Sequence, residues 1–187
     1  MGAILGLMRL NFRSVDELLA LAVRHVNAGH NERAVMLCEL ARVHQPPHAG
    51  VLQLLALLNL QRGQSAAAVE QAQASLALRP GHAPTLQVAV NAWFERALQL
   101  QDVHEYEAAT QALRAVLQLA PDRAEAEVNL GIVLQELGRL DEALQAYGRA
   151  YRLDEDSFGR IAHALSAAGV GRIWLRLSDL RATLSTA

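Results

Sequence analysis

The sequence contains no lysine, a single cysteine and few aromatic residues. All 17 of its basic residues are arginine, Phe, Trp and Tyr together make up 4% of the chain, and Cys38 is the one thiol. A lone cysteine excludes an internal disulfide. The bias toward arginine is typical of a GC-rich bacterial gene and carries no information about mechanism.

No apolar run is long enough to span a bilayer, although 52% of the residues are hydrophobic. The formal net charge of -2 gives no long-range attraction to a polyanion, which argues against a nucleic-acid or membrane-surface protein. The first residues are apolar but lack the basic segment and the small-residue cleavage site of a secretory signal. We therefore expect a cytoplasmic protein. Alanine and leucine dominate and β-branched clusters are sparse, which predicts an all-α chain.

Small residues recur along the chain at a fixed spacing. Pro46 and Pro80 are 34 residues apart (80 − 46), the length of one helix-turn-helix repeat. Aligned units start at Val15, Ala49 and Ala124. Their shared small residues are Ala22, Ala56 and Gly131 at the eighth position, Gly29, Gly63 and Gly138 at the fifteenth, and Ala34, Ala68 and Ala143 at the twentieth. This recurrence predicts consecutive helix pairs that cross closely and are joined at left-handed glycine turns.

The segment VNLGIVLQELGRLDEALQAYGRAYRLDED, residues 128–156, resembles a tetratricopeptide repeat. The matching positions are Leu130, Gly131, Gly138, Ala143, Tyr147 and Ala150. The other units depart from the family pattern, with Leu18 and Leu52 where an aromatic residue is usual, and Glu155 stands where proline would close the last unit. The resemblance implies an all-α, right-handed superhelical solenoid of about four helix-turn-helix pairs and a C-terminal capping helix.

Domain boundaries follow from this repeat. We predict an N-terminal apolar segment at 1–14, repeat units at 15–48, 49–82, 83–123 and 124–157, and a capping helix with a tail at 158–187. The third unit is seven residues too long, because Pro80 and Pro121 are 41 residues apart (121 − 80). Two extra helical turns, in a first helix from about Pro84 to Gln101, would accommodate the excess. His104 stands in this unit where the others have glycine.

Helix ends carry local signals. Ser14 followed by Glu17 forms a capping box, and Asp122 followed by Glu125 resembles one. In the tail, Ser178 is placed to cap a short final helix, whereas Ile173, Leu175 and Leu177 alternate as in an extended segment.

The resemblance places a ligand groove along the first helix of each unit. The residues expected to line it are Leu19, Val23, Leu54, Leu57, Asn91, Phe94, Leu98, Val128, Asn129 and Ile132. Most are apolar, so the expected partner is an apolar or amphipathic segment of another protein or peptide, of this chain's own terminus, or of a second copy. A carboxylate clamp is disfavoured because Leu54 occupies a clamp asparagine position and lysine is absent.

No catalytic, cofactor or metal site is predicted. His44 and His48 have a helical ligand spacing, but Pro46 and Pro47 between them break the helix. Cys38 is expected to be a buried structural thiol, and the acidic run 154–156 a set of solvated charges.

These features favour a non-enzymatic interaction module of the bacterial cytoplasm: an adaptor, a scaffold or an assembly factor. One alternative is a regulatory or substrate-positioning repeat domain of an enzyme system such as a glycosyl- or sulfotransferase. A second is a nucleic-acid-binding regulator that uses the basic C-terminal tail, with Arg160, Arg172, Arg176 and Arg181. Copurification separates the first two functions, and a salt-dependent shift with duplex DNA would support the third.

Overall fold

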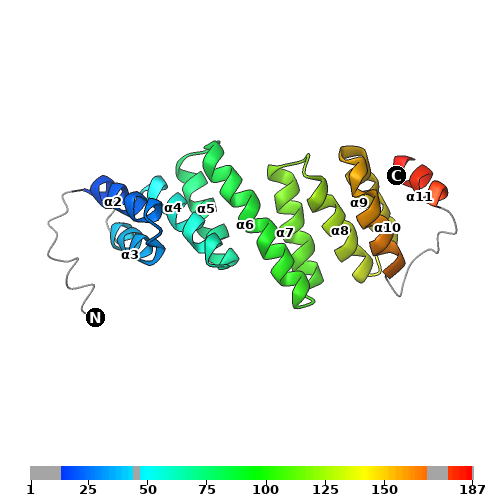
Figure 1. Ribbon diagram of the computed structural model, residues 1–187, viewed down its shortest axis with the longest axis horizontal. Coiled ribbons are helices and arrows are strands. Elements are labelled where there is room, and N and C mark those ends of the chain that lie inside the picture. Colours follow the sequence, from blue (N-terminus) through cyan, green and yellow to red (C-terminus); the bar gives the residue numbers. More distant parts are fainter. Residues whose placement is uncertain (1–13, 44–46, 168–176, 187) are drawn as a thin grey trace. The chain divides into compact units, whose positions relative to one another are not determined.

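The computed structural model describes residues 14–43, 47–167 and 177–186, in which all regular structure is helical (Figure 1). The prediction of an all-α chain built from consecutive helix pairs is confirmed. In chain order the helices are α2 (Val15–Asn27), α3 (Asn31–Arg42), α4 (Ala49–Gln61), α5 (Ser65–Leu78), α6 (Ala83–Asp102), α7 (Tyr106–Leu119), α8 (Ala124–Glu136), α9 (Leu140–Leu153), the 3-10 helix η1 (Glu155–Ser157), α10 (Phe158–Ala167) and α11 (Leu177–Thr186). None of these described helices is both long and apolar enough to cross a membrane.

The chain divides into two compact units, Met1–Ala89 and Val90–Ala187, which we call unit 1 and unit 2. The boundary falls inside the 20-residue helix α6. Each unit has buried clusters of its own.

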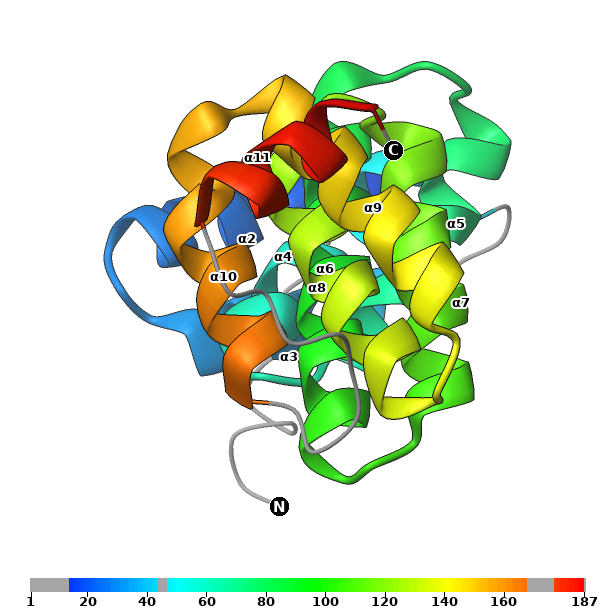
Figure 2. The same ribbon diagram turned by 90° about the vertical axis from the view of Figure 1, so that its right-hand side faces the viewer.

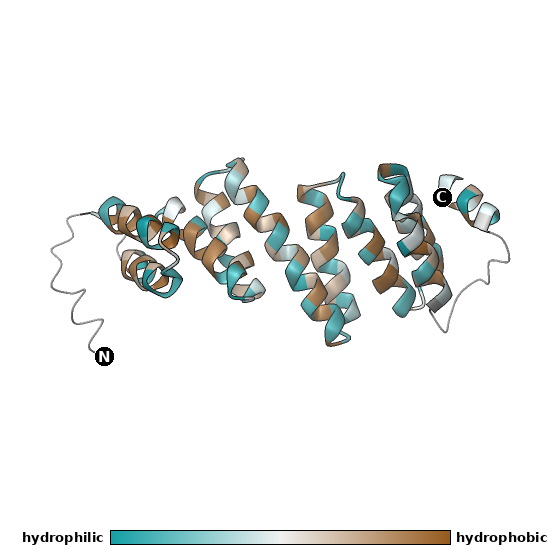
Figure 3. Ribbon diagram, in the orientation of Figure 1, coloured by the Kyte–Doolittle hydropathy of each residue, from teal (hydrophilic) through white to brown (hydrophobic). Residues whose placement is uncertain are grey.

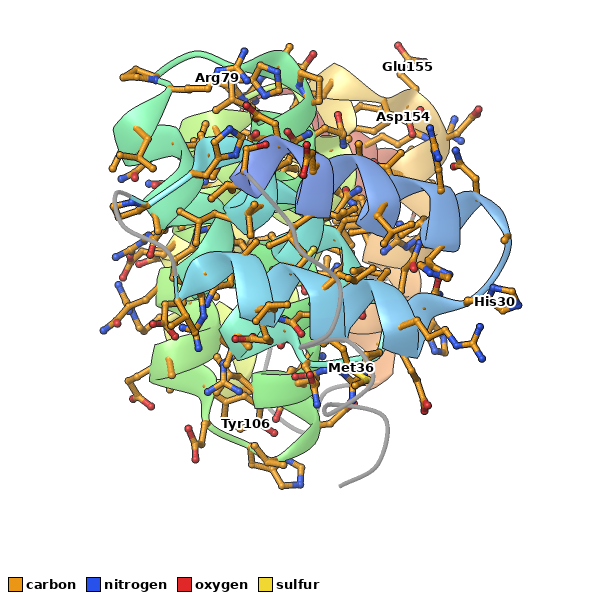
Figure 4. The ribbon with its side chains drawn as sticks, turned by 90° about the vertical axis from the view of Figure 1, so that its left-hand side faces the viewer. His30, Met36, Arg79, Tyr106, Asp154 and Glu155 are labelled. Carbon is orange, nitrogen blue, oxygen red and sulfur yellow. The ribbon has the colours of Figure 1, made fainter. Side chains whose placement is uncertain are left out.

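Left-handed turns join the two helices of each pair, as the glycine spacing predicts. Gly29, Gly63 and Gly138 have φ angles of 76°, 71° and 74°. His104 takes the same place between α6 and α7 with a φ of 61°, which costs a residue with a side chain roughly 1–2 kcal/mol. Its Nδ1 lies 2.6 Å from the hydroxyl of Tyr106. Figure 4 labels Tyr106, which begins α7. A local hydrogen bond thus accompanies the unfavourable backbone.

The two predicted helix caps have different outcomes. The Ser14 hydroxyl accepts a hydrogen bond from the Glu17 amide at 3.2 Å and caps α2, as predicted. The cap predicted at Asp122 is wrong, because α8 begins one residue later, with Arg123 at the N-cap position and no side-chain cap bond.

In unit 1, small residues allow α2 and α3 to cross closely. Ala22 and Ala34 are fully buried, and large side chains from the first three helices surround them. These are Leu18, Leu37, Val51, Leu55 and Leu58, together with the thiol of Cys38. A second cluster joins Ala56 of α4 and Ala72 of α5 to Val88 of α6. Helix α4 therefore packs on two sides, which explains why most of its residues are apolar, as the hydropathy colouring of Figure 3 indicates.

The core of unit 2 combines the end of α6 with α7 to α11. Gly131 of α8 faces the fully buried ring of Tyr147 on α9, and a Cβ at Gly131 would overlap that ring. The Tyr147 hydroxyl donates to Gln135 Oε1 at 2.9 Å. Burial raises the pKa of Tyr147, so the phenol remains neutral at physiological pH. A glycine and a large ring therefore fill one crossing, as the repeat pattern implies.

Two helices close the C-terminal end of unit 2. Helix α10 packs on α8 and buries Ile161 completely, as expected of a capping helix. Helix α11 lies on α9 and α10 (Figure 2). The extended pattern at Ile173 and Leu175 falls outside the described residues, whereas Leu177 begins a helix rather than continuing that pattern, and Ser178 lies inside the helix.

Candidate protein-interaction surface

The four groove residues predicted in unit 1 lie on the first helices α2 and α4. Leu19, Leu54 and Leu57 are partly buried, and Val23 is 40% exposed. The Leu19 methyl carbon Cδ2 lies 2.9 Å from the place that a Cβ on Gly50 would occupy. The missing side chain at Gly50 therefore lets α2 and α4 approach, and apolar side chains of both helices remain accessible in this unit.

The six groove residues predicted in unit 2 lie on α6 and α8. Asn91, Leu98 and Ile132 are partly exposed, but Phe94, Val128 and Asn129 are only 6%, 0% and 7% exposed. The structure therefore removes these last three residues from the surface that a partner can touch.

A neighbouring side chain explains the burial of Phe94. The Arg123 guanidinium lies over the Phe94 ring, 4.2 Å from its centroid, and Arg123 Nη1 donates to Asn91 Oδ1 at 3.3 Å. Near the end of α8, Gln135 Nε2 donates to the Ala164 carbonyl at 3.3 Å, so the capping helix α10 contacts α8 at that end. Repeat register places a residue on a helix face but does not show which neighbour covers it.

An ion pair that the sequence analysis missed joins α8 to α9. Arg149 Nε and Nη2 donate to the two carboxylate oxygens of Glu127 at 2.7 and 2.9 Å. The Glu127 side chain is 7% exposed, so the paired guanidinium satisfies a nearly buried charge. The spacing of 22 residues across two helices gives no local sequence signal.

Unit 2 also contains a pocket that the sequence analysis did not predict. It has a volume of about 430 Å³ and lies between α7 and α9, with α8 at its base. Its lining residues are Arg114, Leu117, Gln118, Leu130, Leu134, Glu142, Gln145 and Arg149. The polar residues at 142, 145 and 149 share one face of α9, and this spacing is the signal that was available.

Two arginines surround the carboxylate of Glu142, which lines this pocket. Arg139 donates to both of its oxygens, and Arg114 Nη2 lies 3.6 Å from Oε2. The hydrogen bonds from Arg139, with the charges of Arg139 and Arg114, lower the pKa of Glu142. The carboxylate is therefore ionised at neutral pH and shared by two arginines.

The thiol of Cys38 lies in the core, whereas the acidic run 154–156 lies at the surface. Cys38 is fully buried, and burial together with the charge of Glu39 raises its pKa to about 12. The acidic run after α9 is exposed, Asp154 and Glu155 point outward in Figure 4, and Asp154 Oδ1 accepts from the Asp156 amide at 3.0 Å. The Asp154 carboxylate therefore caps the N-terminus of η1.

Of the two histidines with helical ligand spacing, His44 lies outside the described residues. His48 Nε2 lies 3.3 Å from Asp16 Oδ1. In the described ranges, no three His, Cys, Asp or Glu side chains are grouped so that they could hold a metal ion.

The basic C-terminal residues are only partly described. Arg172 and Arg176 fall in the segment that the structure leaves out, and Arg160 is exposed. The Arg181 guanidinium lies over the Phe158 ring, 4.5 Å from its centroid. One arginine of the proposed nucleic-acid tail is therefore engaged within the protein.

Comparison with known proteins gives a family match for part of the chain and similar folds among solved structures. Residues 100–168 match the family model described as tetratricopeptide repeat. No curated protein matches the chain in sequence at a significant level.

Similar solved structures include several of MamA. A MamA RS-1 ArsTM double mutant is 18% identical, with 94% of each chain covered and a TM-score of 0.62. MamA 41-end from Desulfovibrio magneticus RS-1 is 19% identical, covers 94% of this chain and 91% of that one, and has a TM-score of 0.59. MamA AMB-1 is 22% identical, covers 92% and 90%, and has a TM-score of 0.58. At these identities the likeness concerns the fold alone.

The helix pairs, their glycine turns and the small residues at their crossings agree with the family match over residues 100–168. Residues 100–168 of the chain therefore belong to the tetratricopeptide repeat family.

Proposed function

We propose that this chain is a protein–protein interaction module, an adaptor, scaffold or assembly factor that binds a polypeptide segment and performs no chemistry itself. The observation that carries the proposal is a set of accessible apolar side chains on the first helices. The set comprises Leu19, Val23, Leu54 and Leu57 in unit 1, and Leu98 and Ile132 in unit 2. In unit 2 the partly exposed amide of Asn91 adds a polar contact beside them.

The chemistry of this set favours an apolar or amphipathic partner segment. Burial of apolar surface contributes about 25 cal/mol per Å², and the costs of association reduce that gain. Because no charged side chain belongs to the set, we expect binding to change little with ionic strength.

The biological setting of the proposal follows from the sequence. The arginine-only composition favours a bacterial protein, and we propose the cytoplasm as its compartment. We also propose repeat boundaries at 15–48, 49–82, 83–123 and 124–157. In this division α6 is the long first helix of the third repeat.

Two substitutions in unit 1 provide a matched test. Val23→Asp places a charge on the proposed surface, whereas Leu78→Asp makes the same kind of change at the end of α5. The two wild-type side chains are 40% and 45% exposed, so neither variant introduces a charge into the core. Partners captured from a lysate of the native host are identified by mass spectrometry, and the affinity of the purified partner is then measured for each variant.

We expect Val23→Asp to weaken binding at least about tenfold, equivalent to about 1.4 kcal/mol, and Leu78→Asp to leave it unchanged. Equal affinities for both variants would exclude the first-helix surface of unit 1. Phe94→Asp and Val128→Asp are unsuitable for this test, because both side chains are buried and a charge there would destabilise unit 2.

A further inference from the structure

Helix α11 packs on the rest of unit 2 through two leucines that are one helical turn apart. Leu180 and Leu184 are 1% and 0% exposed and belong to the main core cluster. Two further contacts fix the helix, because Arg181 stacks over Phe158 of α10 and Arg152 Nη1 donates to the Leu184 carbonyl at 3.4 Å. Figure 2 shows α11 lying along the outer side of unit 2 beside α9 and α10. The face beneath it therefore accepts a short amphipathic helix.

By itself, α11 is a weak helix. It has only 10 residues, fewer than the roughly 12–15 that an isolated helix needs to be even marginally stable in water. The hydroxyls of Thr183, Ser185 and Thr186 bond back to carbonyls one turn earlier, at 3.0, 2.9 and 3.2 Å. Such bonds offer the backbone an alternative to regular helix geometry and slightly destabilise helices. The helical state of α11 therefore depends on its contacts with α9 and α10.

We propose that the face of α9 and α10 beneath α11 is a helix-docking site for a partner protein, and that α11 is its replaceable internal occupant. The partner segment that fits is an amphipathic helix with two leucine-like side chains four residues apart. An arginine directly after the first of them would stack on Phe158, as Arg181 does. This surface is distinct from the apolar set on the first helices and goes beyond the function proposed above.

A partner helix must compete with α11, which belongs to the same chain as the docking site. A covalently linked helix has an effective concentration in the millimolar range, so a free helix must dock better than α11 to replace it. A partner with stronger intrinsic helicity does so, because less of its binding energy is used to order the backbone. The apparent association constant of the wild-type protein then equals the intrinsic constant multiplied by the fraction of molecules in which α11 is undocked.

The test uses the protein's own helix as the probe. A fluorescent peptide of residues 177–187 carries a hydrocarbon cross-link between positions 178 and 182, both of which are exposed. Leu180, Arg181 and Leu184 remain available for docking. The hosts are the full chain, the full chain with Leu180→Asp and Leu184→Asp, and a control with Ala182→Asp, which adds a charge to the exposed side of α11.

We expect the doubly substituted chain to bind the peptide at least about tenfold more tightly than the wild type or the Ala182→Asp control, because its site is vacated. A peptide that carries Leu184→Asp should not bind. If the doubly substituted chain keeps its circular dichroism spectrum but binds no more tightly than the control, the proposal is overturned.

Hydrogen exchange on the wild-type chain keeps the proposal testable even if the double substitution unfolds unit 2. The α11 amides should exchange at least about tenfold faster than those of the α9 core, since a replaceable helix must open by itself. Equal exchange rates for α11 and α9 would show that α11 separates only when the unit unfolds, which also overturns the proposal. Neither measurement depends on Val23 or on a partner from the host.

Discussion

Replacement of Gly131 by alanine perturbs a close crossing of α8 and α9 in unit 2. A Cβ at this position would lie 2.8 Å from Tyr147 Cζ and would overlap the neighbouring ring carbons as well. Tyr147 is fully buried, so its ring has no solvent-facing side into which it can withdraw. The added methyl group must therefore shift the ring or separate α8 from α9.

Opposing effects set the size of the change in the free energy of unfolding. Alanine in place of glycine stabilises a helix interior by about 1 kcal/mol. Overpacking of a well-filled core costs about 1–3 kcal/mol. A shifted ring also loses the Tyr147–Gln135 hydrogen bond, which contributes about 1 kcal/mol. We therefore expect Gly131→Ala to lower the free energy of unfolding of unit 2 by roughly 1–3 kcal/mol.

Urea denaturation followed by tryptophan fluorescence suits this measurement, because Trp93 packs against the core of unit 2. The matched control is Gly159→Ala in α10, where a Cβ would meet no atom within 4 Å. That variant should be more stable than the wild type by about 0.5–1 kcal/mol. Combination of Gly131→Ala with Tyr147→Leu should recover part of the loss. If Gly131→Ala were as stabilising as the control, the assigned crossing of α8 and α9 would be wrong.

Two further predictions test packing and reactivity. Ala109→Leu and Ala143→Leu should each lower the stability of unit 2 by about 1–3 kcal/mol, because both positions are buried at helix crossings, and unchanged urea midpoints would contradict the repeat register. Cys38 should react with a thiol reagent at pH 8 at least about a hundredfold more slowly in the folded protein than in urea, since a pKa raised to about 12 leaves little thiolate; similar rates would mean that the thiol is accessible.

The sequence predicted the features that repeat. Gly63, for example, stands at a fixed position in its unit, and a left-handed turn is the physical reason for a glycine there. Ala34 and Ala143 were likewise predicted at helix crossings by their small size, and both are buried. The long spacing in the third unit predicted a long first helix, and α6 in that region has 20 residues.

Features that depend on one particular neighbour could not be predicted. Phe94 occupies a groove position of the family, but Arg123 covers its ring. Val128 was assigned to the same surface, yet it is fully buried between packed helices. The Glu127–Arg149 ion pair and the pocket between α7 and α9 each combine side chains from different helices, and no periodic pattern specifies such combinations.

The order of helix packing has a consequence for how the chain acquires its structure during synthesis. Among the described helices, α2 packs with α3, α3 with α4, α4 with α5, and later α7 with α8 and α8 with α9. Contacts between segments close in sequence require little loop-closure entropy and favour rapid folding. Each helix of unit 1 finds its partners among residues made shortly before or after it. Unit 1 can therefore assemble while the ribosome is still translating the residues that follow Ala89.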